Sequence, residues 1–279
     1  MSEASGEPVA NDEPNIRLLD EVWASIDELG AGLGETEWKT PSELPGWSVQ
    51  DNLSHIVGTE RTMRGEPTPD NDPPADHVRN PIGELNEHWV ERYRTWSGAE
   101  LLAEFDRLRA ERLAELRALP PERFDEVGPT PVGEAPFREF LAVRVFDSWI
   151  HEQDMRRALA RPGHLTGPVV ELSMRRMATA MPYVVGKKVG APDRTTVVFD
   201  ITAPDGTPVT TVAVAVDGRA ALVEPPPDPD VRLRLDLVAF TALSTGRWDP
   251  ATALADGVVA FEGDDALGRH VVEQMNFMV

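Results

Sequence analysis

Apolar residues recur at helical spacing in the first part of this chain, up to about residue 160, and at strand spacing in much of the remainder. In the first part, a Ser48–Asp51 capping box begins one helix, and proline-rich segments at 65–81 and 128–136 predict loops. Four or five helices joined by loops are typical of a helical bundle. Besides the capped helix, the stretches expected to be helical are 16–34, 82–96, 99–119 and 137–159.

The pattern changes after Gly163. A helix over about 168–185 precedes segments rich in β-branched residues, and residues 231–236 alternate strictly between apolar and charged side chains. Further helices and one more strand follow, which predicts a smaller α/β domain with a mostly antiparallel sheet. The fold class is therefore α+β with two domains. The expected organisation is a disordered acidic tail over 1–14, a helical bundle over 15–163 and the second domain over 164–279.

Composition narrows the classes of function. The formal net charge is −21 and the isoelectric point is about 4.6, so the chain repels phosphate backbones and anionic lipid, and we expect neither a nucleic-acid nor a membrane partner. The acidic start lacks the features of a signal peptide, which predicts a cytoplasmic protein. The chain has no cysteine, so a metal must be held by His, Asp or Glu, and any thiol must come from outside.

A polar stripe crosses the largely apolar helix predicted before Gly163. Arg144, Asp147, His151 and Asp154 are spaced by three, four and three residues, which places them on one helix face. Asp147 and His151 stand one turn apart, a common way for a helix to offer two ligands to one metal. A third ligand is needed, and His55 on the capped helix is the natural candidate, since bundles build metal sites from facing helices.

These residues also have plain structural explanations. A histidine at the margin of an apolar face, such as His55, is typically a hydrogen-bonded structural residue, and the stripe could equally be a solvated face with an ion pair. The residue pattern alone therefore supports a helical bundle with a candidate metal site. Of the other histidines, His77, His164 and His270 are expected at the surface, and His88 on a helix away from the cleft.

Several segments resemble one known family. "LPGWSVQDNLSHIVG" and "RVFDSWIHEQDMRRAL" resemble the two metal-binding segments of the mycothiol-dependent maleylpyruvate isomerase family, and "TALSTGRWDP" and "VAFEGDDALGRHVVEQMN" resemble its C-terminal domain. The resemblance covers nearly the whole chain, with the motifs in the expected order. It implies a DinB-like, metal-binding four-helix bundle followed by a domain related to sterol-carrier-type folds.

The resemblance also implies roles for individual residues. His55 and His151 match the family's two histidine ligands, and Asp147 matches its acidic ligand, which is glutamate in the isomerase proper. Arg247 matches an arginine placed near the metal cleft, where it could bind a carboxylate of the thiol or substrate as a catalytic and cofactor-binding residue; it could equally be an exposed arginine after a helix. Asp154 is expected to pair with a ligand histidine or with Arg144.

A site of this kind implies a divalent metal, zinc first, with nickel, iron or manganese as alternatives, and mycothiol as the thiol cosubstrate. The expected function is thiol activation for addition to a small electrophile, as isomerase or S-transferase. Two alternatives stay open: a metal-dependent hydrolase of a thiol conjugate or amide, and a non-catalytic module that binds an apolar ligand. The expected partners are the thiol and the electrophile, and the expected state is a monomer or weak dimer.

Overall fold

The computed structural model describes residues 13–74, 76–130 and 133–278. The chain divides into two compact units, Met1–Leu172 and Ser173–Val279, and the division falls inside helix α7 (Pro168–Tyr183). The boundary expected from the sequence, near Gly163, lies earlier in the chain. The acidic tail predicted over 1–14 lies outside the described residues up to residue 12, and its last residue already belongs to the first helix.

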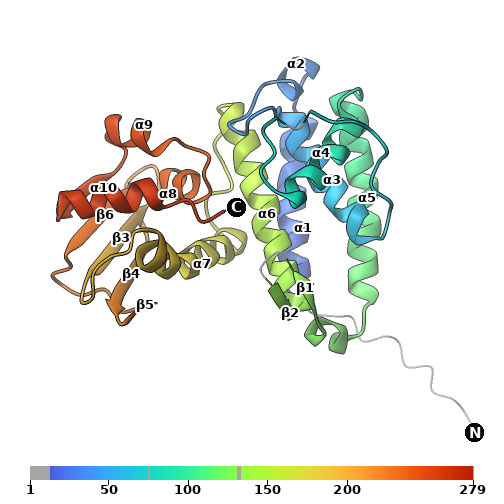
Figure 1. Ribbon diagram of the computed structural model, residues 1–279. Coiled ribbons are helices and arrows are strands. Elements are labelled where there is room, and N and C mark those ends of the chain that lie inside the picture. The colour runs from blue at the N-terminus through green and yellow to red at the C-terminus, as the bar shows by residue number, and fades with distance from the viewer. Residues whose placement is uncertain (1–12, 75, 131–132, 279) are drawn as a thin grey trace, which may run out of the picture. The chain divides into compact units, whose positions relative to one another are not determined.

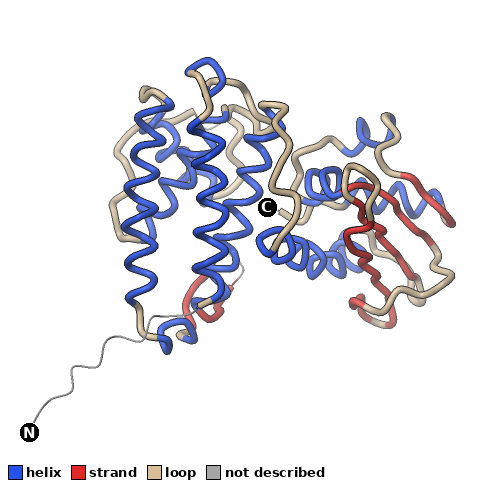
Figure 2. Tube along the Cα trace, turned by 180° about the vertical axis from the view of Figure 1, so that it is seen from behind, coloured by secondary structure: helices blue, strands red, loops and turns tan. Residues whose placement is uncertain are grey.

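The first unit is a helical bundle, as predicted. Four long helices pack side by side along their lengths (Figures 1 and 2), with apolar side chains such as Trp23, Leu53 and Trp149 almost completely buried between them. A fifth helix packs along one of the four, and a short helix connects two of them. The four are α1 (Pro14–Ala31), α3 (Val49–Met63), α5 (Gly98–Ala118) and α6 (Phe137–Ala158); the others are α4 (Pro81–Tyr93) and α2 (Glu35–Trp38).

Helix α3 begins where the capping box predicts. The Ser48 hydroxyl accepts a hydrogen bond from the Asp51 backbone amide (3.3 Å), and the Asp51 carboxylate accepts one from the Ser48 amide (2.7 Å). Farther along, Gly58 faces α4, and a Cβ at this position would lie 2.3 Å from Cβ of Trp89. The glycine therefore lets α4 approach α3 closely, and this contact positions the residues of α4 near the candidate site.

The prediction of a loop over 128–136 is wrong in part, because the described residues of this segment form two paired β-strands. Strands β1 (Val127–Thr130) and β2 (Gly133–Pro136) pair in antiparallel register. The prolines and glycines that signalled a loop are compatible with this ladder, because both strands lie at an edge of their two-stranded sheet. A short 3₁₀ helix, η1 (Pro121–Asp125), leads from α5 into the hairpin.

The second unit contains the mostly antiparallel sheet that the sequence predicts. The strand order is β5-β4-β3-β6-β7, and only the β3–β6 pair is parallel. Helices gather on one side of this sheet (Figure 2), and α8 and α10 contact β6. The strands are β3 (Thr196–Thr202), β4 (Pro208–Asp217), β5 (Arg219–Leu222), β6 (Val231–Asp236) and β7 (Ala260–Gly263); the helical elements are α7, η2 (Val184–Lys188), α8 (Leu237–Ser244), α9 (Pro250–Ala255) and α10 (Asp265–Gln274).

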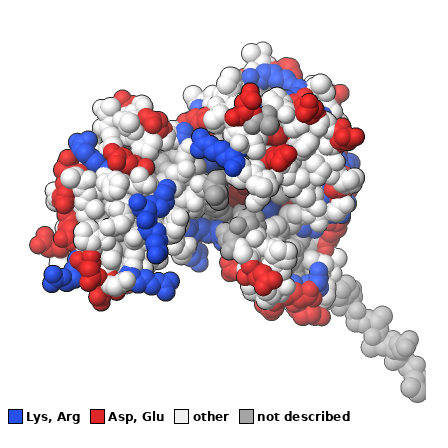
Figure 3. Space-filling model, in the orientation of Figure 1, with Lys and Arg blue, Asp and Glu red and all other residues white. Residues whose placement is uncertain are grey.

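The alternation in β6 has a structural basis. Val231, Leu233 and Leu235 are buried, whereas Arg232 and Arg234 lie on the opposite side of the strand and pair with acidic residues of neighbouring strands. Acidic and basic side chains are likewise interspersed over the face drawn in Figure 3. Among the described residues, no helix has the length and apolar character that crossing a membrane requires.

Candidate metal centre

The structure brings three residues of the first unit together: His55 from α3, and Asp147 and His151 from α6. Each offers one ligand atom, and these atoms all lie within 4.8 Å of one another. His55 Nε2 lies 3.3 Å from Asp147 Oδ2, and His151 Nε2 lies 3.7 Å from Asp147 Oδ1. The Nε2 atoms of both imidazoles therefore face one carboxylate, which is the arrangement expected of three ligands converging on one ion.

The hydrogen bond of His151 fixes which of its nitrogens is available. Its Nδ1 lies 2.8 Å from the side-chain oxygen of Asn52 and 3.3 Å from Asp154 Oδ2. Both partners are acceptors, so Nδ1 carries the proton and the lone pair stays on Nε2, toward Asp147. Of the two roles expected for Asp154, the structure supports pairing with the histidine; Asp154 also pairs with Arg157 (2.5 Å).

His55 is held in its neutral form. Its side chain is only 7% exposed, and burial lowers the pKa of His55 against the opposing effect of the nearby Asp147 carboxylate. Its Nδ1 is buried and has no hydrogen-bond partner among the described residues. A neutral imidazole is the form that binds a metal, so the burial of His55 favours a ligand role over that of a charged partner.

Asp147 stays ionised because of its neighbours. Burial by itself would raise the pKa of Asp147, but the positive charge of Arg144, together with the contact to His55, outweighs burial and holds the pKa well below its usual range. Arg144 Nη1 donates to Asp147 Oδ2 (2.5 Å), and its Nε donates to Glu60 Oε1 (2.9 Å). The carboxylate of Asp147 is thus kept as an anion and fixed in orientation.

One side of the cluster is closed by an aromatic ring. The centroid of the Trp47 indole lies 5.5 Å from that of His55 and 5.7 Å from that of His151, and the two imidazole centroids are 4.5 Å apart. The side chains of the histidines are 7% and 8% exposed, whereas that of Asp147 is 24% exposed. Solvent therefore reaches the cluster from the side of the carboxylate.

The remaining histidines pair with other groups. His77 Nε2 lies 2.8 Å from Glu87, His88 Nδ1 lies 2.7 Å from the side-chain oxygen of Asn71, and His270 is exposed. His164 was expected at the surface, and this was wrong: its side chain is 10% exposed. The cause is the buried Glu152, whose carboxylate lies 2.6 Å from His164 Nδ1.

Arg247 belongs to the second unit. It follows α8, and its Nη1 donates to the backbone carbonyl of Thr245 (2.9 Å). Its expected role beside the metal stays a prediction. Sequence reasoning missed three residues around the cluster: Asn52, Trp47 and Glu60. Asn52 lies three residues before His55 on α3, but that spacing alone gave no indication that it binds a histidine from another helix.

Comparisons with known proteins agree with this geometry. Residues 19–156 match the family described as "Mycothiol maleylpyruvate isomerase N-terminal domain", and residues 187–276 match the "SCP-2 sterol transfer family". All three residues of the cluster lie within the first match. No curated protein matches the sequence.

Two solved structures share the fold along most of the chain. One is mycothiol-dependent maleylpyruvate isomerase, with 17% sequence identity and a TM-score of 0.56, and the other is a variant of it with one histidine replaced by alanine, with 18% identity and the same TM-score. Each likeness covers 90% of this chain and 92% of the other. The chain thus joins an N-terminal domain of the mycothiol maleylpyruvate isomerase family to a domain of the SCP-2 sterol transfer family.

Proposed function

We propose that this chain is a metal-dependent enzyme that uses a low-molecular-weight thiol, mycothiol, in the conversion of a small electrophile. The observation that carries the proposal is the convergence of His55, Asp147 and His151, within 4.8 Å of one another, inside the domain that matches the mycothiol maleylpyruvate isomerase family. The solved structures with the same fold are named as mycothiol-dependent enzymes, which supports the choice of thiol.

The residues of the cluster fit a divalent cation. Two imidazole nitrogens and one carboxylate are a donor set that suits zinc, and nickel, iron or manganese could also be held. His151 already presents its free lone pair, because Asn52 and Asp154 accept from its other nitrogen. Three protein ligands leave coordination positions for water or substrate, and the exposed side of Asp147 is where such positions would be reached.

The aspartate is the chain's departure from the glutamate of the isomerase proper. Its side chain is one methylene shorter, so the carboxylate lies closer to α6. Arg144 binds that carboxylate through Nη1 and is itself fixed by Glu60, so the shorter ligand is held in one orientation. We infer that the departure shifts the position of the cation without removing the site.

The chemistry that such a site supplies, with its cation in place, is a lowered thiol pKa, which makes the thiolate available near neutral pH. The protein's own residues set the conditions for this. His55 stays neutral, Asp147 stays ionised, and Trp47 excludes water from the side of the histidines. The chain has no cysteine, so no protein thiol competes for the cation or the electrophile.

The proposed reaction is addition of the thiolate to a conjugated double bond. Addition forms a C–S bond and turns the double bond into a single bond that can rotate; elimination then breaks the same C–S bond and returns the thiolate. The outcome is cis–trans isomerisation, and an adduct that is released instead makes the enzyme an S-transferase. Arg247 of the second unit is proposed to bind a carboxylate of the thiol or substrate.

Metal content tests the site. In protein purified without a histidine tag, we expect about one divalent ion per chain by mass spectrometry, lost in His55→Ala and His151→Ala but kept in His270→Ala. His270 is exposed and is therefore the matched control; circular dichroism checks that each variant is folded. No metal above background in the wild type, even after reconstitution with zinc or nickel, would contradict the proposal.

Product analysis tests the reaction. The metal-loaded protein is incubated with mycothiol and a conjugated, carboxylate-bearing electrophile, and the mixture is analysed by mass spectrometry. An isomer or a thioether supports thiol addition. A cleaved thiol conjugate or amide contradicts it and points to a hydrolase, and co-purified lipid with no turnover points to a module that binds an apolar ligand.

A further inference from the structure

A buried carboxylate on α4 has no part in the cluster described above. Glu87 is 2% exposed, and its Oε1 accepts a hydrogen bond from the indole Nε1 of Trp47 (2.5 Å). His77 Nε2 lies 2.8 Å from the same oxygen, and Arg94 Nη2 lies 3.5 Å from Oε2. Burying a carboxylate costs free energy unless it is paired, so Glu87 is held in place by several partners at once.

Trp47 links this carboxylate to the candidate metal centre. One end of its indole is anchored by Glu87, while the ring lies against the imidazoles of both His55 and His151. Trp47 therefore contacts two of the three predicted ligands without being one. The orientation of the indole decides whether both imidazoles are covered.

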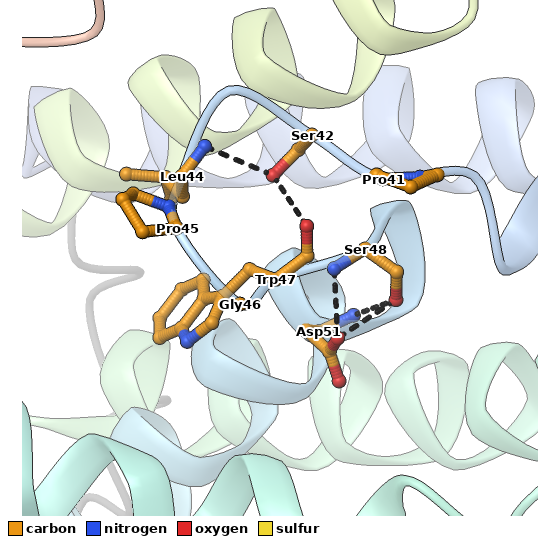
Figure 4. A pocket seen from close by; sticks show the side chains of 8 residues that line it. All are labelled: Pro41, Ser42, Leu44, Pro45, Gly46, Trp47, Ser48 and Asp51. Atoms are coloured by element: carbon orange, nitrogen blue, oxygen red, sulfur yellow. Dashed lines mark hydrogen bonds between the residues drawn. The ribbon is translucent and has the colours of Figure 1, made fainter. Parts of the chain in front are cut away.

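The Trp47 side chain is buried and also borders open space. Trp47 lines a pocket of about 370 Å³, together with residues of the loop before α3. Figure 4 shows the indole, Leu44 and Pro45 on one side of this pocket and the Ser48–Asp51 cap on the other. The pocket borders the indole, and the ring lies against both histidines. The hydrogen bond to Glu87 selects the orientation that covers them.

The loop that carries Trp47 is tied to α4 at a second point. Arg94, which follows α4, donates from Nη2 to the carbonyl of Gly46 (3.3 Å). Gly46 has a φ of +78°, and a Cβ there would lie 3.2 Å from the imidazole of His77, so this position favours glycine twice over. Glu87 and Arg94 thus hold consecutive residues of the loop.

We propose that Glu87 is a positioning residue that clamps the Trp47 indole over His55 and His151, so that the metal centre is closed on the histidine side and open at Asp147. This inference rests on the proposed function. The clamp orients the ligands before the cation binds and slows the cation's escape, in the way that groups supporting a ligand shell tune metal sites.

Cobalt(II) is the probe for the test, because its visible absorption reports ligand geometry. We measure the spectrum and the rate of Co²⁺ release to a chelator. Glu87→Met removes the acceptor and should speed release about tenfold and alter the spectrum. Glu87→Gln keeps an oxygen that accepts from Trp47 and should behave like the wild type. Glu84→Met, on the same helix but exposed, is the matched control and should change neither readout.

Coupling separates a clamp from a general effect on folding. Trp47→Phe keeps a ring but loses the N–H, so adding Glu87→Met in that background should change release by no more than about twofold. The proposal is overturned if Glu87→Met releases Co²⁺ at the wild-type rate. It is also overturned if adding Glu87→Met to Trp47→Phe speeds release as much as it does in the wild type. If Glu87→Met does not fold, Trp47→Phe removes the same hydrogen bond from the other partner and must itself speed release.

The clamp is also measurable without metal. In the apoprotein, the Trp47 indole shifts the ring-proton resonances of His55 and His151 in NMR spectra, and Glu87→Met should reduce these shifts while Glu87→Gln keeps them. If the wild type binds no cobalt but the shifts respond in this way, the proposed function fails and the clamp stands. If cobalt binds and the shifts do not respond, the clamp fails alone.

Discussion

Charge alternates along four side chains at the candidate metal centre: Asp147, Arg144, Glu60 and Arg112. The last three are buried. Each charge has an opposite neighbour within 3.0 Å, so none is left uncompensated away from water. At the residue scale, this series of ion pairs is what allows an ionised aspartate to stand beside two buried histidines.

Removing Arg144 interrupts this series of ion pairs between Asp147 and Glu60. We expect Arg144→Met to lower the free energy of unfolding by about 3 to 5 kcal/mol, because Asp147 loses a partner and Glu60 keeps only Arg112. Arg144→Lys should recover only part of the loss, since an ammonium on a flexible stem keeps the charge but lacks the planar fork of donors with which the guanidinium binds Asp147 and Glu60. Urea denaturation of the apoprotein, with a chelator present, measures both variants.

The control for this prediction is an arginine with the same kind of partners at the surface. Arg107 pairs with Glu104 and Glu111 but is half exposed. Arg107→Met should cost less than about 1 kcal/mol. Equal losses for Arg107→Met and Arg144→Met would contradict the view that burial gives the Arg144 pairs their importance.

Local spacing explains which site residues could be predicted. Asp147 and His151 are one turn apart on a single helix, so the sequence alone places them together. His55 needed the resemblance as well, because its partner is 92 residues away in the chain. Glu87 could not be found in this way: its role depends on how α4 packs on α3, and in the sequence it is one glutamate among several on an amphipathic helix.

At the scale of elements, strong periodicity was reliable, whereas turn signals were right for the loop before α4 and wrong for the segment before α6. The bundle helices and the alternating strand β6 were predicted because each buries one face and repeats its pattern over several residues. The hairpin β1–β2 was missed because its short strands contain proline and glycine, which signal loops wherever they occur. Pairing of the two strands with each other, which no local pattern reveals, overrides that signal.

The segment between α6 and α7 is held by a charged hydrogen bond. His164, at φ 51°, lies 2.6 Å from the fully buried Glu152, and Glu21 lies 3.6 Å away; Arg156 also binds Glu152. Burial by itself would lower the pKa of His164, but the two carboxylates outweigh it and raise the pKa. Trp149 donates to the His164 carbonyl, so this contact fixes the backbone that leads to α7.

The sign of the resulting pH dependence follows. Because the folded-state pKa of His164 is above its ordinary value of about 6.5, the stabilisation is complete below that value and is lost as pH rises through the folded-state pKa. We expect the free energy of unfolding to fall more between pH 6 and pH 8 in the wild type than in His164→Asn, where asparagine tolerates the positive φ and does not titrate. Parallel pH profiles from urea denaturation would exclude this contribution.

At the scale of the whole molecule, the candidate site and its supporting contacts lie in the first unit, whereas Arg247 lies in the second. The match to the N-terminal family domain ends at residue 156. It therefore leaves out His164, which contacts Trp149 and Glu152 inside the matched domain. We therefore expect the part of the chain needed for a stable bundle to be longer than the matched domain. It includes the segment that leads into α7.

Two fragments test this division. A fragment of residues 13–172 retains every contact of the cluster and of His164, so we expect it to fold, to bind cobalt with wild-type affinity and to show no turnover, because Arg247 is absent. A fragment of residues 13–163 loses His164, so the Trp149 indole loses the carbonyl that it donates to and Glu152 keeps only Arg156 and Ser25, and its melting temperature should be lower. Cobalt titration, thermal melting and product analysis measure the three properties.

Turnover by the 13–172 fragment would remove Arg247 from the proposed mechanism. A folded 13–172 fragment that binds no cobalt would show instead that the second unit completes the metal site.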